Sequence, residues 1–239
     1  MSNSYDEATL VQRLEDIQER IDEALSRSDV DQDVTLVAVS KTHPTEAMEV
    51  LYAHGLRDFG ESYVQEWQDK YDALPADIRW HFVGRLQSNK AKYLADKVHR
   101  VHSIDRKSVT KKLARRSSGM ESVFLQVNLA DQDSKGGVAP EKLHDLYDLV
   151  THYDNLEVVG LMGMPPYADD PEDNRPHFRH LRELMISLQD YVADAYPDRR
   201  QVLRELSMGM SNDFEVAIEE GATVIRVGTA LFGERNYDG

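Results

Sequence analysis

The sequence alternates between short apolar runs and amphipathic stretches along its whole length, and this alternation is what most limits its fold. Val34–Ser40 is a β-branched run with almost no polar residue. Such a run is typical of a strand that is covered on both faces, as in a parallel sheet. Eight strands are predicted in this way, at 34–40, 57–60, 79–83, 98–104, 122–129, 156–162, 202–208 and 222–227.

Helical patterns lie between these runs. Near the N-terminus, apolar residues recur every three or four positions from Leu10 to Leu25, which predicts a helix over 8–27 with one apolar face. The clearest later pattern runs from Phe178 to Ala195. Shorter helices are predicted over Asp105–Ser118, Pro140–Thr151 and Asn212–Glu220.

Eight strand–helix repeats in 239 residues are typical of a (β/α)8 TIM barrel. An open, doubly wound sheet is the alternative, although such sheets usually have fewer strands. No linker rich in Gly, Ser or Pro divides the chain, and 169–176 has the composition of a polar loop inside a repeat. We therefore expect an α/β fold in which residues 1–239 form a single (β/α)8 barrel domain with an extra N-terminal helix.

Composition excludes several classes of function. The chain has no cysteine, which rules out disulfides, thiolate metal sites and a cysteine nucleophile. It has no apolar run long enough to span a membrane, and its first residues lack the apolar core of a signal peptide. The net charge of −15 opposes general affinity for nucleic acid or anionic lipid. These features predict a soluble cytoplasmic protein.

One segment departs from this acidic character. Residues 85–116 hold eleven basic and only two acidic side chains. Nucleic-acid binding and docking of an acidic protein partner are the functional alternatives here, and solvated helix faces are the simpler one. Nucleic acid is disfavoured because Tyr93 is the only aromatic residue in the segment that could stack on a base.

In a barrel, the active site lies where the strands end at their carboxyl side. The last two predicted strands are followed by Gly209 and Gly228, which permit close backbone approach to an anion. The hydroxyls of Ser207, Ser211 and Thr229 add hydrogen-bond donors. Loops seven and eight form the phosphate site of many barrels. The alternative is ordinary turn chemistry, with Ser211 as the N-cap of the next helix.

Lys41 ends the first apolar strand, which places it in the barrel or at its mouth. A desolvated lysine amine has a lowered pKa and can form a Schiff base with an aldehyde. The alternative is a structural ion pair with a carboxylate such as Glu61 at the rim. A lysine together with a phosphate site points to a phosphorylated aldehyde, of which pyridoxal 5′-phosphate is one candidate.

Six segments in order resemble the YggS/PROSC family of pyridoxal phosphate homeostasis proteins. They are Leu36–Thr42, Phe59–Glu66, Trp80–Lys90, His102–Arg106, Leu206–Asp213 and Ala222–Gly233. The resemblance covers about residues 10 to 235 and implies the barrel of the alanine racemase N-terminal domain. It also implies a role in cofactor homeostasis, in which the protein holds the cofactor without catalysis and delivers it to apoenzymes. The absence of a second domain after the last of these segments favours a monomer.

The resemblance assigns roles to single residues. Lys41 matches the lysine that binds the cofactor as a Schiff base, and Arg226 matches an arginine that faces the pyridine nitrogen. The positions that match the phosphate cradle are Ser207, Met208, Gly209, Gly228 and Thr229. Ser62 stands where the family commonly has Asn, and Lys135 matches a secondary lysine near the mouth.

An amino-acid racemase of the same fold type is the main rival function. Such racemases add a second domain that supplies an opposing tyrosine, and only six residues follow the last motif here. His81 or Tyr63 would then have to act as the second base. A metal site is not expected, because the pairs His177/His180 and His99/His102 lack a third ligand, and the second pair is predicted to point to opposite faces of its strand.

Overall fold

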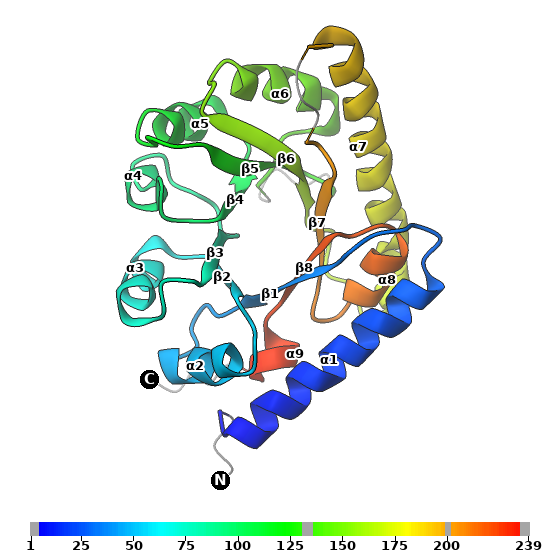
Figure 1. Ribbon diagram of the computed structural model, residues 1–239. Coiled ribbons are helices and arrows are strands. Elements are labelled where there is room, and N and C mark those ends of the chain that lie inside the picture. Colours follow the sequence, from blue (N-terminus) through cyan, green and yellow to red (C-terminus); the bar gives the residue numbers. More distant parts are fainter. Residues whose placement is uncertain (1–4, 131–135, 199–201, 235–239) are drawn as a thin grey trace.

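The strands form a closed parallel barrel in the order β1 to β8, with helices around it (Figure 1). The computed structural model describes residues 5–130, 136–198 and 202–234. The strands are β1 (Thr35–Val39), β2 (Asp58–Glu61), β3 (Arg79–Phe82), β4 (Arg100–Ile104), β5 (Glu121–Val127), β6 (Leu156–Gly163), β7 (Glu205–Met210) and β8 (Val224–Val227). All eight predicted strands are confirmed, and closure of the sheet excludes the open alternative.

The helices alternate with these strands. They are α1 (Glu7–Arg27), α2 (Thr45–Ala53), α3 (Val64–Ala73), α4 (Ala91–Leu94), α5 (Lys107–Ala114), η1 (Pro140–Lys142), α6 (Leu143–Thr151), η2 (Pro171–Asn174), α7 (Arg175–Ala195), α8 (Phe214–Glu219) and α9 (Thr229–Phe232). In the part of the chain that the structure describes, none of them has the length and apolar character needed to cross a membrane.

The two sides of each strand have different roles. Side chains on one side pack outward against the helices and form the large core. Those on the other side fill the barrel, where Val37, Phe124, Val159, Met162 and Val224 form a separate apolar cluster. Because successive side chains of a strand alternate between the two sides, the position of a polar residue in this alternation decides whether it lies inside the barrel.

Helix α1 is the predicted N-terminal addition to the barrel. Asp6 caps it by accepting a hydrogen bond from the Thr9 backbone N–H. Its apolar stripe, which includes Leu10, Leu14 and Ile17, is buried against helices that include α2, α8 and α9. The first helix of the chain is therefore packed against the last two (Figure 1).

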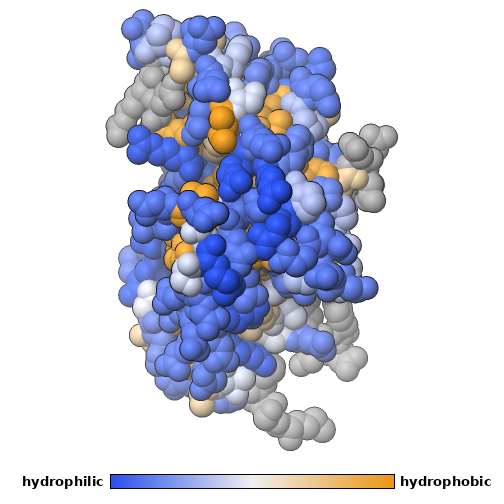
Figure 2. All heavy atoms as spheres, turned by 90° about the vertical axis from the view of Figure 1, so that its right-hand side faces the viewer, coloured by the Kyte–Doolittle hydropathy of each residue, from blue (hydrophilic) through white to orange (hydrophobic). Residues whose placement is uncertain are grey.

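Ion pairs add to the packing between α1, α7 and α8. Arg27 of α1 pairs with Glu219 at 2.6 Å, and Arg175 of α7 pairs with both Glu219 and Glu220. Arg179 also pairs with Glu220, at 2.8 Å. Figure 2 shows that this side of the molecule is mostly hydrophilic. The network fixes the two ends of the chain to each other through charged side chains.

Two parts of the helical layer differ from the sequence prediction. Residues 169–176 were expected as a polar loop, but Pro171–Asn174 forms η2 and α7 begins at Arg175. Proline at the start of η2 and the Asp170 cap explain this, since both favour a helical turn in a polar sequence. The third repeat has only a four-residue helix, Ala91–Leu94, which is too short to give a periodic pattern.

Candidate functional site

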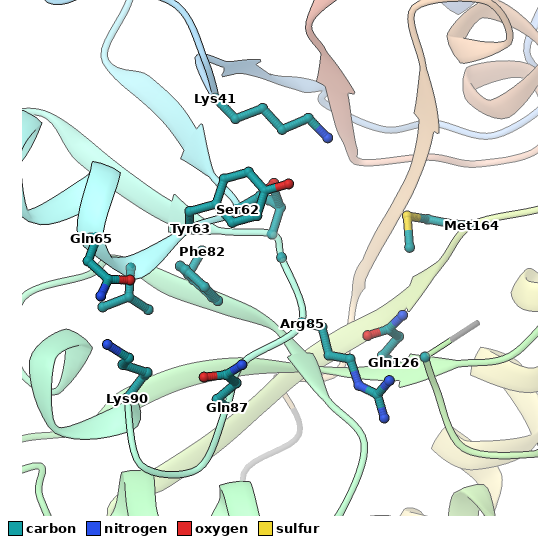
Figure 3. Close-up of a pocket in the computed structure, with 14 residues that line it drawn as sticks. Lys41, Ser62, Tyr63, Gln65, Phe82, Arg85, Gln87, Lys90, Gln126 and Met164 are labelled. Carbon is teal, nitrogen blue, oxygen red and sulfur yellow. The ribbon is translucent and has the colours of Figure 1, made fainter. Parts of the chain in front are cut away.

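A cavity of about 430 Å³ lies at the carboxyl ends of the strands. Residues that follow β1, β2, β3 and β6, together with Gln126 inside β5, line it (Figure 3). The lining residues are Lys41, Ser62, Tyr63, Val64, Gln65, Phe82, Val83, Gly84, Arg85, Gln87, Lys90, Gln126, Gly136 and Met164. The cavity therefore combines cations and amides with apolar side chains.

Lys41 reaches this cavity because of its place on β1. The side chains of Val37 and Val39 lie within the barrel, next to Gly60. Lys41 continues the same two-residue period past the strand end, whereas Ser40 faces the helices. Figure 3 shows the Lys41 side chain extended from the end of β1 into the open space. The structure thus places Lys41 at the barrel mouth, as the sequence predicts.

A buried ion pair fixes the backbone beside Lys41. The Lys70 amine donates to the Ser40 carbonyl oxygen and to Glu61, both at 2.6 Å, and to Glu66 at 2.7 Å. Ser40 also donates its hydroxyl to Glu61 at 2.7 Å. Burial raises the pKa of Glu61, and the Lys70 charge opposes that rise. The sequence offered Glu61 as a rim partner for Lys41, but the structure pairs Glu61 with Lys70 between β2 and α3.

The residue after Lys41 has an uncommon backbone conformation. Thr42 has a φ of 67°, in the left-handed region that few non-glycine residues adopt. Its backbone N–H donates to Glu66, which the Lys70 amine holds in turn. Two side chains of α3 therefore hold both neighbours of Lys41 in place, because Lys70 binds Ser40 and Glu66 binds Thr42.

Ser62 and Tyr63 follow β2 and face the same cavity (Figure 3). The loops after β2 and β3 touch closely there, since a Cβ on Gly84 would lie 2.2 Å from the Ser62 carbonyl oxygen. Tyr63 is 60% exposed, so its ring borders the solvent. Ser62, which stands where the family commonly has Asn, therefore lines the same cavity as Lys41.

The loops after β7 and β8 are joined by Ser211. Its hydroxyl accepts hydrogen bonds from the backbone N–H groups of Gly228, at 3.2 Å, and Ala230, at 3.1 Å. Ser211 was the expected N-cap of the following helix under the simpler alternative, but Asp213 is the N-cap residue of α8. The predicted phosphate loops are therefore in contact, and β8 places them next to β1.

Glycine is required in the first of these loops. Gly209 has a φ of 88°, and a Cβ there would lie 2.7 Å from the Cβ of Ala217. Gly228 lies beside the end of β1, where a Cβ would be 3.4 Å from the Val39 carbonyl oxygen. Thr229 is exposed at the start of α9. Of these residues, only Gly228 is placed beside the end of β1, and none of them is among the residues that line the cavity with Lys41.

Three of the predicted site residues lie deeper. The Met208 side chain packs in the outer core, so only its backbone faces the loops. Ser207 and Arg226 point into the barrel, where Arg226 donates to the Ser207 hydroxyl at 2.6 Å and to the Gly163 carbonyl at 3.1 Å. Burial lowers the pKa of Arg226 to about 10, with Asp213 acting in the opposite direction. Arg226 remains a cation at neutral pH.

Sequence reasoning did not select several cavity residues. Arg85, Gln87 and Lys90 follow β3 and lie within both the basic segment and the family segment Trp80–Lys90, but neither gave them a site role, and Gln126 and Met164 carry no motif of their own. Two sequence signals could have selected them: a position at the end of a strand, and a place among the alternate strand residues that face the barrel interior. Lys135, the expected secondary lysine, lies outside the described residues.

The histidines also differ from expectation. His99 and His102 were predicted to point to opposite faces of a strand, but His99 precedes β4 and both rings lie against His81, at centroid distances of 5.4 and 5.2 Å. His81 is buried in the barrel with both ring nitrogens hydrogen-bonded. It is therefore not placed to act as the second base of a racemase at the cavity.

Comparison with known proteins gives the family. A family model described as alanine racemase, N-terminal domain, matches residues 12–236. A protein of Aquifex aeolicus named pyridoxal phosphate homeostasis protein is 46% identical over 231 residues, which are 95% of this chain and 98% of that protein. This chain belongs to the family of pyridoxal phosphate homeostasis proteins.

Solved structures of the family and of its fold agree with this assignment. The structure of PipY of Synechococcus elongatus with PLP bound is 33% identical, has a TM-score of 0.78, and covers 94% of this chain and 100% of that one. An alanine racemase of Clostridium difficile is only 11% identical, with a TM-score of 0.68 and coverage of 96% of this chain and 60% of that one. The second likeness shows the barrel fold alone, so the racemase alternative is not favoured.

Proposed function

We propose that this protein binds pyridoxal 5′-phosphate as a Schiff base on Lys41 and serves cofactor homeostasis by keeping the reactive aldehyde in a bound store. The position of Lys41 carries this proposal, because its side chain extends from an interior strand position into the cavity at the barrel mouth. The family adds support, since the related PipY structure has PLP bound.

The residues around the cavity fit such a group. Its volume of about 430 Å³ is within the range of small-molecule sites. We assign the phosphate to Gly209, Gly228 and Thr229, with Met208 contributing through its backbone, because Ser211 joins the loops after β7 and β8 and β8 is the neighbour of β1. Ser62, which follows β2, is assigned to the cofactor on the side of Lys41 away from the loops after β7 and β8.

Arg226 is assigned to the pyridine nitrogen of the cofactor. A guanidinium donates hydrogen bonds and keeps its proton, so it leaves a ring nitrogen unprotonated. An unprotonated pyridine withdraws electrons weakly, which suits storage of the cofactor better than carbanion chemistry. Ser207 holds Arg226 in place through its hydroxyl.

The test is to trap the bond on Lys41. Purified protein is loaded with the cofactor, reduced with borohydride to make the Schiff base permanent, and digested for mass spectrometry. We expect the label on Lys41, and no label and no visible Schiff-base band in Lys41→Ala. Lys90→Ala is the matched control, because Lys90 lines the same cavity and should leave the label in place. Labelling of Lys90 in the wild-type protein, with Lys41 unlabelled, would refute the assignment.

We extend the proposal to delivery of the bound cofactor to apoenzymes in the cytoplasm by a monomeric protein that does not bind nucleic acid. Loaded protein should activate an apoenzyme faster than its measured release of free cofactor allows, and an equal rate would contradict direct delivery. Size-exclusion chromatography, cell fractionation and a nucleic-acid binding assay test the other three predictions.

A further inference from the structure

A continuous row of hydrogen bonds crosses the barrel interior below the cavity. Arg226 on β8 donates to Ser207 on β7, whose hydroxyl lies 2.8 Å from Nδ1 of His102 on β4. Nε2 of His102 lies 2.9 Å from Nδ1 of His81 on β3, and Nε2 of His81 lies 3.0 Å from Asp58 on β2. We call these five residues the interior chain.

The geometry gives the interior chain one direction. Ionised Asp58 can only accept, so Nε2 of His81 carries the proton and donates it, and Nδ1 of a neutral His81 accepts from Nε2 of His102. Nδ1 of His102 is then an acceptor, and the ring proton sits on Nε2, where it is donated to His81. The Ser207 hydroxyl therefore donates its one proton to Nδ1 of His102 and accepts from Arg226. Both rings are neutral in this arrangement.

Charge and burial favour the same arrangement. Burial lowers the pKa of His81, and burial together with neighbouring cations holds the pKa of His102 well below its usual range. Burial acts to raise the pKa of Asp58, but hydrogen bonds from Arg79 and His81 outweigh it and lower that pKa. The interior chain thus begins at a cation, Arg226, ends at an anion, Asp58, and has neutral rings between them.

The surroundings of the two rings complete this account. His102 stacks on Phe124 at a centroid distance of 4.3 Å, which fixes its plane. The charged groups that face the rings are Asp58, Arg79, Arg100 and Arg226, and the neighbouring titratable group is His99. Arg100 is itself paired with Glu205, so its charge is partly balanced.

Arg226 depends on the interior chain for its position. Among the described residues, no carboxylate forms an ion pair with Arg226, and its hydrogen bonds go to the Ser207 hydroxyl and the Gly163 carbonyl. A buried cation without a direct counter-ion is held by the dipoles that accept its protons. Because the Ser207 hydroxyl proton is donated to His102, its lone pairs are turned toward Arg226.

We propose that Asp58, His81 and His102 are positioning residues that orient Arg226 toward the pyridine nitrogen of the bound cofactor by fixing the direction of the Ser207 hydroxyl. This inference rests on the proposed function, because it needs the cofactor ring above Arg226. Asp58 and the histidines touch no cofactor in this account. They act through Ser207, from strands on the other side of the barrel.

The first experiment uses the protein without cofactor and is independent of the proposed function. Two-dimensional ¹⁵N NMR of the histidine rings reports which nitrogen carries the proton. We expect His81 and His102, assigned with single His→Phe variants, to be neutral with the proton on Nε2 at neutral pH. A proton on Nδ1 of either ring, or a charged ring, would overturn the interior chain.

The second experiment uses the loaded protein and the variant His102→Phe, which keeps an aromatic ring beside Phe124. We expect borohydride still to label Lys41, while the ratio of the Schiff-base absorption bands changes and cofactor affinity falls about tenfold, the effect of one lost hydrogen bond to a charged group. Ser207→Ala should give the same spectral change, and it provides the test if His102→Phe does not fold.

His99→Phe is the matched control. His99 contacts the His81 ring by its edge, but it has no hydrogen bond in the interior chain, so its spectrum and affinity should match the wild type. A wild-type spectrum in folded Ser207→Ala or His102→Phe would refute the positioning role. If wild-type Lys41 is not labelled, the proposed function fails instead, and the NMR result still decides the direction of the interior chain.

Discussion

Replacing Lys70 with Met tests how the backbone beside Lys41 is held. Lys70 is 5% exposed and Glu61 is fully buried, so Lys70→Met leaves a buried carboxylate without its counter-ion. Breaking a buried ion pair in this way costs about 3–5 kcal/mol. The change also removes the hydrogen bond to the Ser40 carbonyl and loosens Glu66, the acceptor for the Thr42 N–H.

Urea unfolding and Schiff-base formation measure the two effects. We expect the unfolding free energy of Lys70→Met to fall by about 3–5 kcal/mol at pH 8, and the occupancy of Lys41 at a fixed cofactor concentration to fall with it. The double variant Lys70→Met/Glu61→Gln removes the unpaired charge. It should recover part of the lost stability, whereas Schiff-base formation should stay impaired because the Ser40 and Glu66 contacts are still missing.

The pH dependence has a definite sign. Without Lys70, the folded-state pKa of Glu61 lies still further above its unfolded value, so the folded form binds a proton more readily than the unfolded chain. The stability that this proton provides is present at low pH and is lost as the pH rises. The deficit of Lys70→Met should therefore be smaller at pH 5 than at pH 8. An unchanged unfolding free energy, or a double variant less stable than the single one, would refute this account.

Three further predictions concern stability. The pKa of buried His102 is lowered, so the unfolding free energy of the wild type should fall by about 1.4 kcal/mol per such histidine as the pH drops from 8 to about 5.5. The unfolding free energy of His102→Phe should fall less over the same range, and an equal fall in the two proteins would contradict this. Gly209→Ala should cost about 1–3 kcal/mol more than Gly55→Ala in urea unfolding, because both have positive φ but only Gly209 lacks space for a Cβ; equal losses would exclude the clash. Arg175→Ala should destabilise by about 1 kcal/mol, and less in 1 M salt, because salt screens its half-buried ion pairs; a salt-independent loss would count against an electrostatic role.

The sequence was sufficient for the fold because the barrel depends on local patterns that repeat. Strands such as β1 and β6 are short, mostly apolar runs, and each long helix has a periodic stripe, as in α1 and α7. The pattern failed where a helix is only one turn long, as in α4, or where a proline starts a turn in a polar stretch, as in η2. In both places local capping and packing decide the structure, and periodicity carries no signal.

The site was predicted less completely. Lys41, Gly209 and Gly228 have distinctive positions in the sequence, and the structure places each of them at the carboxyl end of its strand, β1, β7 and β8 respectively. The partners of Glu61 could not be predicted, because Lys70 lies on the following helix and nothing in the sequence ranks it above Lys41. The interior chain was also hidden, since it joins residues of five strands whose register the sequence does not give.

The closing of the barrel has a consequence for how this chain is made. Strand β1 finds one of its two partners only in β8, where Thr35 pairs with Val224, and α8 and α9, near the other end of the chain, cover part of the apolar stripe of α1. A ribosome delivers these partners last. Throughout most of translation the emerging protein therefore exposes part of the apolar face of α1 and an unpaired edge of β1, and exposed surfaces of this kind are what chaperones protect.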